Sequence, residues 1–421
     1  MSVSQSASSQ YAVSSNDRDM LHSLAMQVAD VAARPEQARK RELWRKHNAL
    51  EPTRPVVFCD PENGWNEILP QQTLACVGDV ARHWEFHLRK ELFWGDSMGD
   101  DRVIEPVFNV GWVASVSDWG MQQAIRSAGE GGAFVWDGPL KSYDDLELLR
   151  YPHVTVDAPA SEALLALAES VFGDALTVRR HQMWWWTMGL TQTAIFLRGY
   201  ETYLTDMCAE PEGLHRFMAL LRDGAMSLID ELEQKGLLCL NNGGDYVGSG
   251  GFGYTDALPQ PDFDGHHVRP IDMWGFGESQ ETSSVGPEQF AEFVFPYQLP
   301  LLERFGLNCY GCCEPLDLRW HTVKQIPRLR RVSVSPWCNL EGMAQNLGAD
   351  YVYSMKPNPA PLAVPRLDQD LIRNSLRQAL DITKDCRVEV IMKDNHTIGR
   401  NPQNVIDWCR IAREEADRVY G

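Results

Sequence analysis

Residues 330–357, "RRVSVSPWCNLEGMAQNLGADYVYSMKP", place a β-rich run, a helical pattern and a second β-rich run directly one after another. The outer runs, 330–336 and 351–357, are short and contain several Val and Tyr residues. The middle run, 338–347, has apolar residues three and four positions apart, which is the period of a helix. A strand, a crossover helix and a second strand predict parallel pairing, so this unit indicates an α/β fold.

The same alternation continues on both sides of this unit. Further strand-like runs lie at 54–60, 102–111, 176–185, 237–245, 307–312 and 386–394. Helical patterns lie near 72–94, 160–171, 210–235, 286–304, 367–383 and 402–418. About eight strands alternating with helices predict a (β/α)8 barrel of the TIM type. Residues 19–48 form a further helical pattern, broken at Pro35, that predicts an N-terminal helical extension.

The alternative is a doubly wound open sheet. No predicted strand is followed by GxGxxG or by a GK[ST] loop, which disfavours the nucleotide-binding versions of that fold. We therefore predict one barrel domain over residues 19–421. Residues 1–18 are polar and serine-rich, and we expect a disordered tail there.

Composition excludes several classes of protein. Of the 421 residues, 44% are hydrophobic and 23% charged, which is typical of a globular chain. No apolar run reaches the roughly 18 residues that a membrane span needs. The net charge of −19 repels phosphate backbones, so we expect no nucleic-acid partner. The ten cysteines are scattered and no secretion signal is evident, so we expect a reducing cytoplasm.

Barrel enzymes perform their chemistry at the carboxyl ends of the strands. In this sequence that rule selects the polar residues that follow the strand-like runs: Asp60, Asn109, His181, Asp245, Cys312, Cys313, Glu314, Lys356, Asp394 and His396.

Two adjacent cysteines and a glutamate stand out in "NCYGCCEPLDLRW", residues 308–320. Thiolates, carboxylates and imidazoles are zinc ligands, and a catalytic zinc keeps one position open. Cys312, Cys313 and Glu314, with His396 from the neighbouring strand end, could supply such a set. In the alternative interpretation the cysteines are packing residues and the histidine caps a loop.

Other candidate residues belong to three segments. Asp245 and Tyr246 lie in the glycine-rich stretch 241–264, and Glu278 and Gln280 lie in "WGFGESQETSS". His181 precedes three tryptophans in "HQMWWWTMG", which would suit a flat ligand. The structural alternatives are a flexible surface loop, a helix cap, and core or inter-subunit packing.

"YGCCEPLDLRWHTVKQIPRLRRVSVSPWCNLEGMAQNLGADYVYSMKPNPA", with "DYVGSGGFGYTDALP" and "WGFGESQETSSVGPEQFAEFVFPY", resembles the uroporphyrinogen decarboxylase superfamily. It resembles most the branch of cobalamin-dependent (corrinoid) methyltransferases and O-demethylases. The decarboxylases carry arginines at the first strand, whereas "VVFCDPENGWNEIL" has none. The methyltransferase branch holds zinc with a His-x-Cys pair and a final cysteine. Asn308 and Tyr310 occupy the places of that pair, and His396 stands near the last.

The resemblance implies a methyltransferase that moves a methyl group between a small methylated substrate, such as an aryl methyl ether, and a corrinoid. The corrinoid would sit on a partner protein or at the barrel mouth, and zinc would assist. We expect Asp245, Glu278, Tyr246, Gln280 and His181 to be catalytic, and a homodimer is a further expectation. The alternatives are a metal-free decarboxylase or lyase that uses Asp245, Glu278 and His396, and a non-catalytic corrinoid-binding module.

Overall fold

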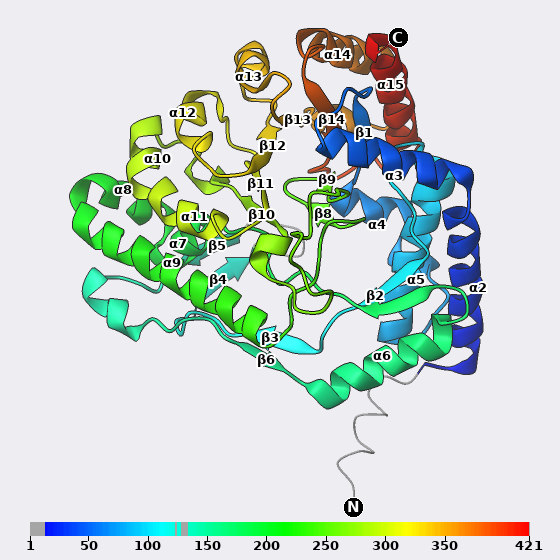
Figure 1. Ribbon diagram of the computed structural model, residues 1–421, viewed down its shortest axis with the longest axis horizontal. Coiled ribbons are helices and arrows are strands. Elements are labelled where there is room, and N and C mark those ends of the chain that lie inside the picture. Colours follow the sequence, from blue (N-terminus) through cyan, green and yellow to red (C-terminus); the bar gives the residue numbers. More distant parts are fainter. Residues whose placement is uncertain (1–12, 123, 128–133, 421) are drawn as a thin grey trace, which may run out of the picture.

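The computed structural model describes residues 13–122, 124–127 and 134–420 (Figure 1). Its central element is a parallel sheet of six strands in the order β1-β14-β13-β12-β11-β10. The strands are β1 (Val56–Cys59), β10 (Trp274–Gly277), β11 (Leu307–Tyr310), β12 (Leu329–Val334), β13 (Val352–Met355) and β14 (Arg387–Met392). All six carboxyl ends therefore lie at one edge of the sheet.

The unit that opened the sequence analysis is confirmed. Helix α13 (Leu340–Leu347) connects β12 to β13, and these two strands pair in parallel. Asn339 caps the helix by accepting the Gly342 N–H at 3.0 Å. The predicted α/β class is therefore correct for this half of the chain.

The closed barrel is not shown by the strand pairing. β2 (Val107–Val110) and β7 (Thr177–Arg180) form a separate parallel pair, and 237–245, predicted as a strand, contains none in the described structure. The remaining pairs are antiparallel: β3 (Ala114–Val116) with β6 (Val154–Val156), β4 (Ala124–Ser127) with β5 (Phe134–Asp137), and β8 (Tyr246–Val247) with β9 (Gly251–Phe252).

Side chains, rather than further strands, bond the two outer edges of the six-stranded sheet. At β1, the Val57 N–H donates to Asp101 Oδ2 at 2.8 Å and the Cys59 N–H to Asp100 at 3.1 Å. At β10, Asn241 accepts the Trp274 N–H at 2.8 Å and donates to its carbonyl at 3.0 Å. These bonds satisfy backbone groups that a barrel would pair with neighbouring strands.

Helices cover the outside of the sheet (Figure 1). The predicted N-terminal extension is present as α2 (Ser15–Ala32) and α3 (Pro35–Asn48), so residues 15–18 of the predicted tail are helical. The other helices are α4 (Trp65–Ile68), α5 (Asp79–Phe93), α6 (Ala158–Phe172), α7 (Thr191–Arg198), α8 (Tyr200–Ala209), α9 (Pro211–Gln234), α10 (Pro287–Phe293), α11 (Phe295–Leu302), α12 (Trp320–Val323), α14 (Gln369–Ile382) and α15 (Gln403–Tyr420). Among the described residues, no helix is both long enough and apolar enough to cross a membrane.

The glycine-rich stretch forms the β8–β9 hairpin against the inner face of the sheet. The Phe252 ring lies 4.7 Å from that of Phe58 on β1. A Cβ at Gly251 would come within 2.3 Å of Arg331 Cζ, and one at Gly250 within 2.5 Å of Ile391 Cγ2. Glycine is required here because the hairpin backbone approaches the strands this closely.

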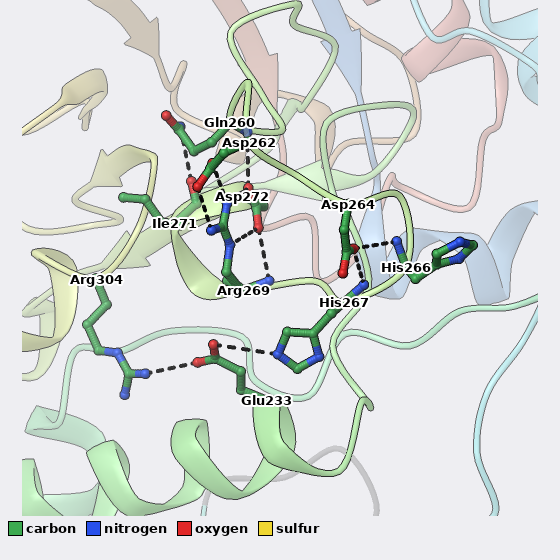
Figure 2. Close-up of polar contacts among 10 residues, drawn as sticks. All are labelled: Glu233, Gln260, Asp262, Asp264, His266, His267, Arg269, Ile271, Asp272 and Arg304. Carbon is green, nitrogen blue, oxygen red and sulfur yellow. Dashed lines mark hydrogen bonds and ion pairs between the residues drawn. The ribbon is translucent and has the colours of Figure 1, made fainter.

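The loop that leads from this hairpin to β10 is fixed by its own ion pairs (Figure 2). Arg269 donates to Asp272 at 2.8 Å and to Asp262 at 2.7 Å. Asp264 accepts the backbone N–H groups of His266 and His267, each at 2.8 Å. Because this cluster precedes the first residue of β10, it lies at the amino end of that strand, where barrel residues serve stability.

Candidate active site at the carboxyl ends of the strands

A cavity of about 530 Å³ opens at the carboxyl ends of β1, β11 and β14. The residues that line it combine acids, a lysine, a thiol and two aromatic rings: Asp60, Glu62, Trp186, Tyr246, Gln280, Cys312, Lys393 and Asp394. We call this the mouth cavity. Its position agrees with the rule that barrel chemistry occurs at this end of the strands.

Two thiols meet at the mouth cavity. Gly311, with a φ of 92°, turns the chain after β11 so that Cys312 and Cys313 follow side by side. Their Sγ atoms are 3.7 Å apart, and Ser249 Oγ donates to Cys312 Sγ at 3.3 Å. The hydrogen bond from Cys313 lowers the pKa of Cys312; burial opposes this, while Lys393 and Ser249 also lower it. The pair therefore holds one thiolate, at Cys312, more readily than an isolated thiol would.

Acidic side chains outnumber basic ones around these two thiols. Lys393 Nζ lies 3.5 Å from Glu62 Oε1 and 3.6 Å from Asp394 Oδ1. Asp60 accepts the Trp65 Nε1–H at 2.8 Å. Burial raises the pKa of Glu62, and the neighbouring Asp394 and Asp60 carboxylates raise it further against the effect of Lys393.

Backbone strain coincides with this cavity. Glu62 and Asp394 have φ values of 49° and 60°, in the left-handed region that residues other than glycine rarely adopt. Such conformations cost energy and gather at functional sites. Their occurrence in two acids that line one cavity supports its assignment as the candidate site.

Glu314 lies behind the mouth cavity and is fully buried. Its Oε1 accepts the Ser279 N–H at 2.8 Å, and its Oε2 accepts the Cys312 N–H at 2.9 Å. Burial raises the pKa of Glu314, although these backbone N–H groups favour the carboxylate. Glu314 thus joins the ends of β10 and β11 and holds the turn that carries Cys312.

Glu278 is also fully buried. Its Oε2 accepts the Gln280 N–H at 2.9 Å, whereas Oε1 has no hydrogen-bond partner among the described residues. Burial, followed by the carboxylates of Glu281 and Glu314, raises the pKa of Glu278 well above its usual range. Burial and the neighbouring carboxylates therefore favour the neutral form of this carboxyl group more than in an exposed glutamate.

His181 and Asp245 form a separate pair. His181 Nε2 lies 2.5 Å from Asp245 Oδ1. Burial opposes the charged imidazole, but hydrogen bonds with Asp245 and Cys239 outweigh it and raise the pKa of His181 to about 9. Asp245 lines a different cavity, of about 410 Å³, beside Arg102 and Arg179.

The predicted zinc ligands are not brought together. His396 is exposed, and its Nδ1 is 3.5 Å from Asn63 Nδ2. Glu314 uses both oxygens for the bonds described above. In the part of the chain that the structure describes, no three His, Cys, Asp or Glu side chains form a group that could hold a metal ion. The donor set does not fit zinc in this arrangement, and zinc stays a prediction without support from the geometry.

Of the residues predicted to be catalytic or metal-binding, Tyr246, Gln280 and Cys312 line the mouth cavity. Cys313 adjoins it, through its Sγ contacts at 3.7 Å to Cys312 and 3.9 Å to Asp394 Oδ2. The strand-end rule had also selected Asp60 and Asp394. It did not select Glu62, Trp186 or Lys393, although Lys393 directly follows β14, which ends at Met392.

An aromatic hollow adjoins the mouth cavity. It measures about 410 Å³ and shares Trp186 and Tyr246 with the mouth cavity. Its other walls are mainly apolar and include Met183, Trp184, Trp185, Trp274 and Phe276. The three predicted aromatic-wall residues 184–186 therefore line a cavity next to the acids rather than only packing in the core.

Comparison with known proteins agrees with the fold. No protein-family model matches the chain, and no curated protein matches it. Among solved structures, a methyltransferase from Methanosarcina mazei is similar to this chain, with a TM-score of 0.50 and 10% sequence identity. The similarity covers 90% of this chain and 98% of the other. At this identity it shows a shared α/β fold.

Proposed function

We propose that the protein is a methyltransferase that moves a methyl group between a small methylated substrate in the mouth cavity and a corrinoid on a partner protein. The observation that carries the proposal is the mouth cavity itself. It places Lys393, Tyr246 and the Cys312 thiol at the strand ends of a fold shared with a methyltransferase.

Transfer of a methyl group requires a nucleophile in line with the bond that breaks. The electron pair of the methyl–heteroatom bond leaves with the heteroatom, so groups that stabilise that atom speed the reaction. Lys393 and Tyr246 line the cavity and can donate hydrogen bonds to a leaving oxygen or nitrogen. The side of the cavity formed by Trp186 is open, because this side chain is 43% exposed.

When bound, a reduced corrinoid supplies the nucleophile. The residues at this end of the strands fit a docked carrier protein. Leu318 and Trp337 follow β11 and β12, and they are 68% and 70% exposed. A carrier that approaches the carboxyl ends of these strands could contact both side chains. They would hold the carrier over the open side.

A decarboxylase or lyase is supported less well. It would need Asp245, Glu278 and His396 to act on one substrate as acid and base. Asp245 is paired with His181, Glu278 is fully buried and His396 contacts Asn63. These three residues do not line the mouth cavity together.

The test uses the purified full-length chain with free cob(I)alamin as the acceptor. Methyl ethers, methylated amines and methyl thioethers are offered in turn, and formation of methylcobalamin is followed by absorbance. We expect one class of donor to react, and we expect Lys393→Gln to slow the reaction at least tenfold. Lys384→Gln, an exposed residue before the same strand, is the matched control.

The proposal is wrong if no donor methylates the corrinoid while the protein decarboxylates an organic acid. Metal analysis of the same preparation, with Cys313→Ala beside it, tests the zinc prediction separately.

A further inference from the structure

The mouth cavity has more negative than positive charge. Three acidic side chains line it, the aspartates Asp60 and Asp394 and the less readily ionised Glu62, against one ammonium group, Lys393. The Cys312 thiol, which ionises more readily than usual, adds to the negative side. The whole chain has a net charge of −19, which attracts cations toward the molecule and repels anions. The cavity therefore favours a positively charged ligand over a neutral or an anionic one.

A metal ion is not the cation that this arrangement favours. Metal ligands must converge within about 2–2.6 Å of one point. Within the described residues, no three acidic, thiol or imidazole side chains form such a group. Carboxylates that are spread around a cavity of about 530 Å³ suit a larger cation with diffuse charge.

Aromatic rings complete the site. Trp186 and Tyr246 line the mouth cavity, and the Trp186 ring lies 5.6 Å from that of Phe276, nearly perpendicular to it. Ring faces attract organic cations, and methylated ammonium groups most characteristically. Both rings also line the aromatic hollow, so an apolar part of the ligand can extend from the charged group into that hollow.

We infer that the methyl donor is a methylated ammonium compound, held with its cationic nitrogen among the mouth carboxylates and against Trp186 and Tyr246. This inference rests on the proposed function and names its substrate class. The C–N bond breaks, its electron pair passes to nitrogen, and the methyl group passes to the reduced corrinoid. The donor is a quaternary ammonium ion, so the product is a neutral tertiary amine and no proton has to be supplied for it to leave.

Calorimetry on the full-length chain without corrinoid tests the inference. Choline is compared with 3,3-dimethylbutan-1-ol, which has the same shape but carries carbon in place of the charged nitrogen. We expect choline to bind at least tenfold more tightly. Asp394→Asn and Trp186→Ala should each weaken choline binding by tenfold or more. The controls Asp385→Asn, at the amino end of β14, and Tyr420→Ala, an exposed aromatic residue at the end of α15, should not.

Equal binding of the two compounds, or binding of neither, overturns the inference. The methylcobalamin assay separates this failure from failure of the proposed function. Methyl transfer from an ether without binding of choline would keep the function and reject the cationic donor. Binding of choline with methyl transfer from an ether alone would keep the function and reject the cation as donor, and binding of choline with no methyl transfer from any donor would reject both.

Discussion

Two adjacent cysteines at the end of a strand act here as one ionising pair. The contact between the two Sγ atoms, 3.7 Å apart, lowers the pKa of Cys312, and Lys393 and Ser249 lower it further against the effect of burial. The same interaction raises the pKa of Cys313. We therefore predict that Cys312 reacts with a small electrophile, methyl methanethiosulfonate, at a pH below that of an ordinary thiol. Cys313→Ala should slow this reaction at pH 7 by up to about tenfold.

The rate is measured for each cysteine by peptide mass mapping across a pH series. Cys208→Ala, an exposed cysteine on α8, is the control and should leave the Cys312 profile unchanged. If Cys313→Ala leaves the midpoint where it was, the pair contributes packing and not proton sharing.

Glu278 gives a prediction about how the folding stability changes with pH. Its pKa is raised in the folded protein, so folding favours the protonated form. The contribution of protonated Glu278 to the folding stability is complete below its unfolded pKa of 4.5. It is lost as the pH rises toward the raised pKa of the folded state. Glu278→Gln should remove this loss, so its stability relative to the wild type should increase above about pH 5, by up to about 1.4 kcal/mol per pH unit.

Urea unfolding at several pH values measures the effect, with the exposed Glu288→Gln as control. A constant difference across the pH range would mean that Glu278 is charged in the folded state. A loss of activity of about a hundredfold with unchanged stability would instead support the acid–base role predicted from the sequence.

The strand-end rule selected part of the site from sequence because parallel strands deliver their last residues to one edge. Cys312, Asp60 and Asp394 were found in this way. Trp186 was only identifiable as one of three tryptophans, since the sequence does not show which ring turns toward the acids. Glu278 and Glu314 were expected at the mouth, but their backbone hydrogen bonds draw both behind it.

At the scale of elements, the β8–β9 hairpin determines how the interior is filled. Gly251→Ala would push a methyl group against Arg331, which lies 3.0 Å from Glu389 in a buried ion pair. Displacing one partner leaves a buried charge uncompensated, so we predict a loss of about 3 kcal/mol or more in unfolding free energy. Tyr246, on the same hairpin, should shift with it and weaken substrate binding.

Chemical denaturation measures the loss. Gly286→Ala before α10 is the control, because a Cβ there meets only the flexible end of Gln289. Equal stability of the two variants would show that the hairpin can move aside without disturbing Arg331.

Most long elements were predictable from the sequence, whereas some short ones were not. The helical patterns at 210–235 and 402–418 correspond to α9 and α15, because long amphipathic periods are unambiguous. β10, "WGFG", was missed since it has four residues and two glycines, which is a weak strand signal. The run 237–245 resembles a strand, but Asn241 bonds to β10 through its side chain instead of through a backbone ladder.

At the scale of the whole molecule, Asp101 connects distant parts of the chain at the outer edge of β1. Its carboxylate accepts from Arg54 at 2.7 and 2.8 Å and from the Val57 N–H at 2.8 Å. Arg413 of the C-terminal helix α15 lies 3.1 Å away. The group is almost fully buried and replaces the neighbouring strand that a closed barrel would provide.

We predict that Asp101→Asn lowers the unfolding free energy by about 3–5 kcal/mol at neutral pH, because it leaves two arginines without their buried partner. Burial opposes ionisation of Asp101, but Arg54 and Arg413 outweigh it and lower its pKa. In the wild type this stabilisation is therefore present above the unfolded pKa of 3.8 and is lost as pH falls toward the folded value.

Asp417→Asn is the matched control: Asp417 also pairs with Arg54, at 3.4 Å, but its side chain is 61% exposed. Solvent screens such a pair, so its removal should change little. Thermal unfolding of both variants from pH 3 to 7 checks the prediction, and equal melting temperatures would show that β1 does not depend on Asp101 for its outer edge.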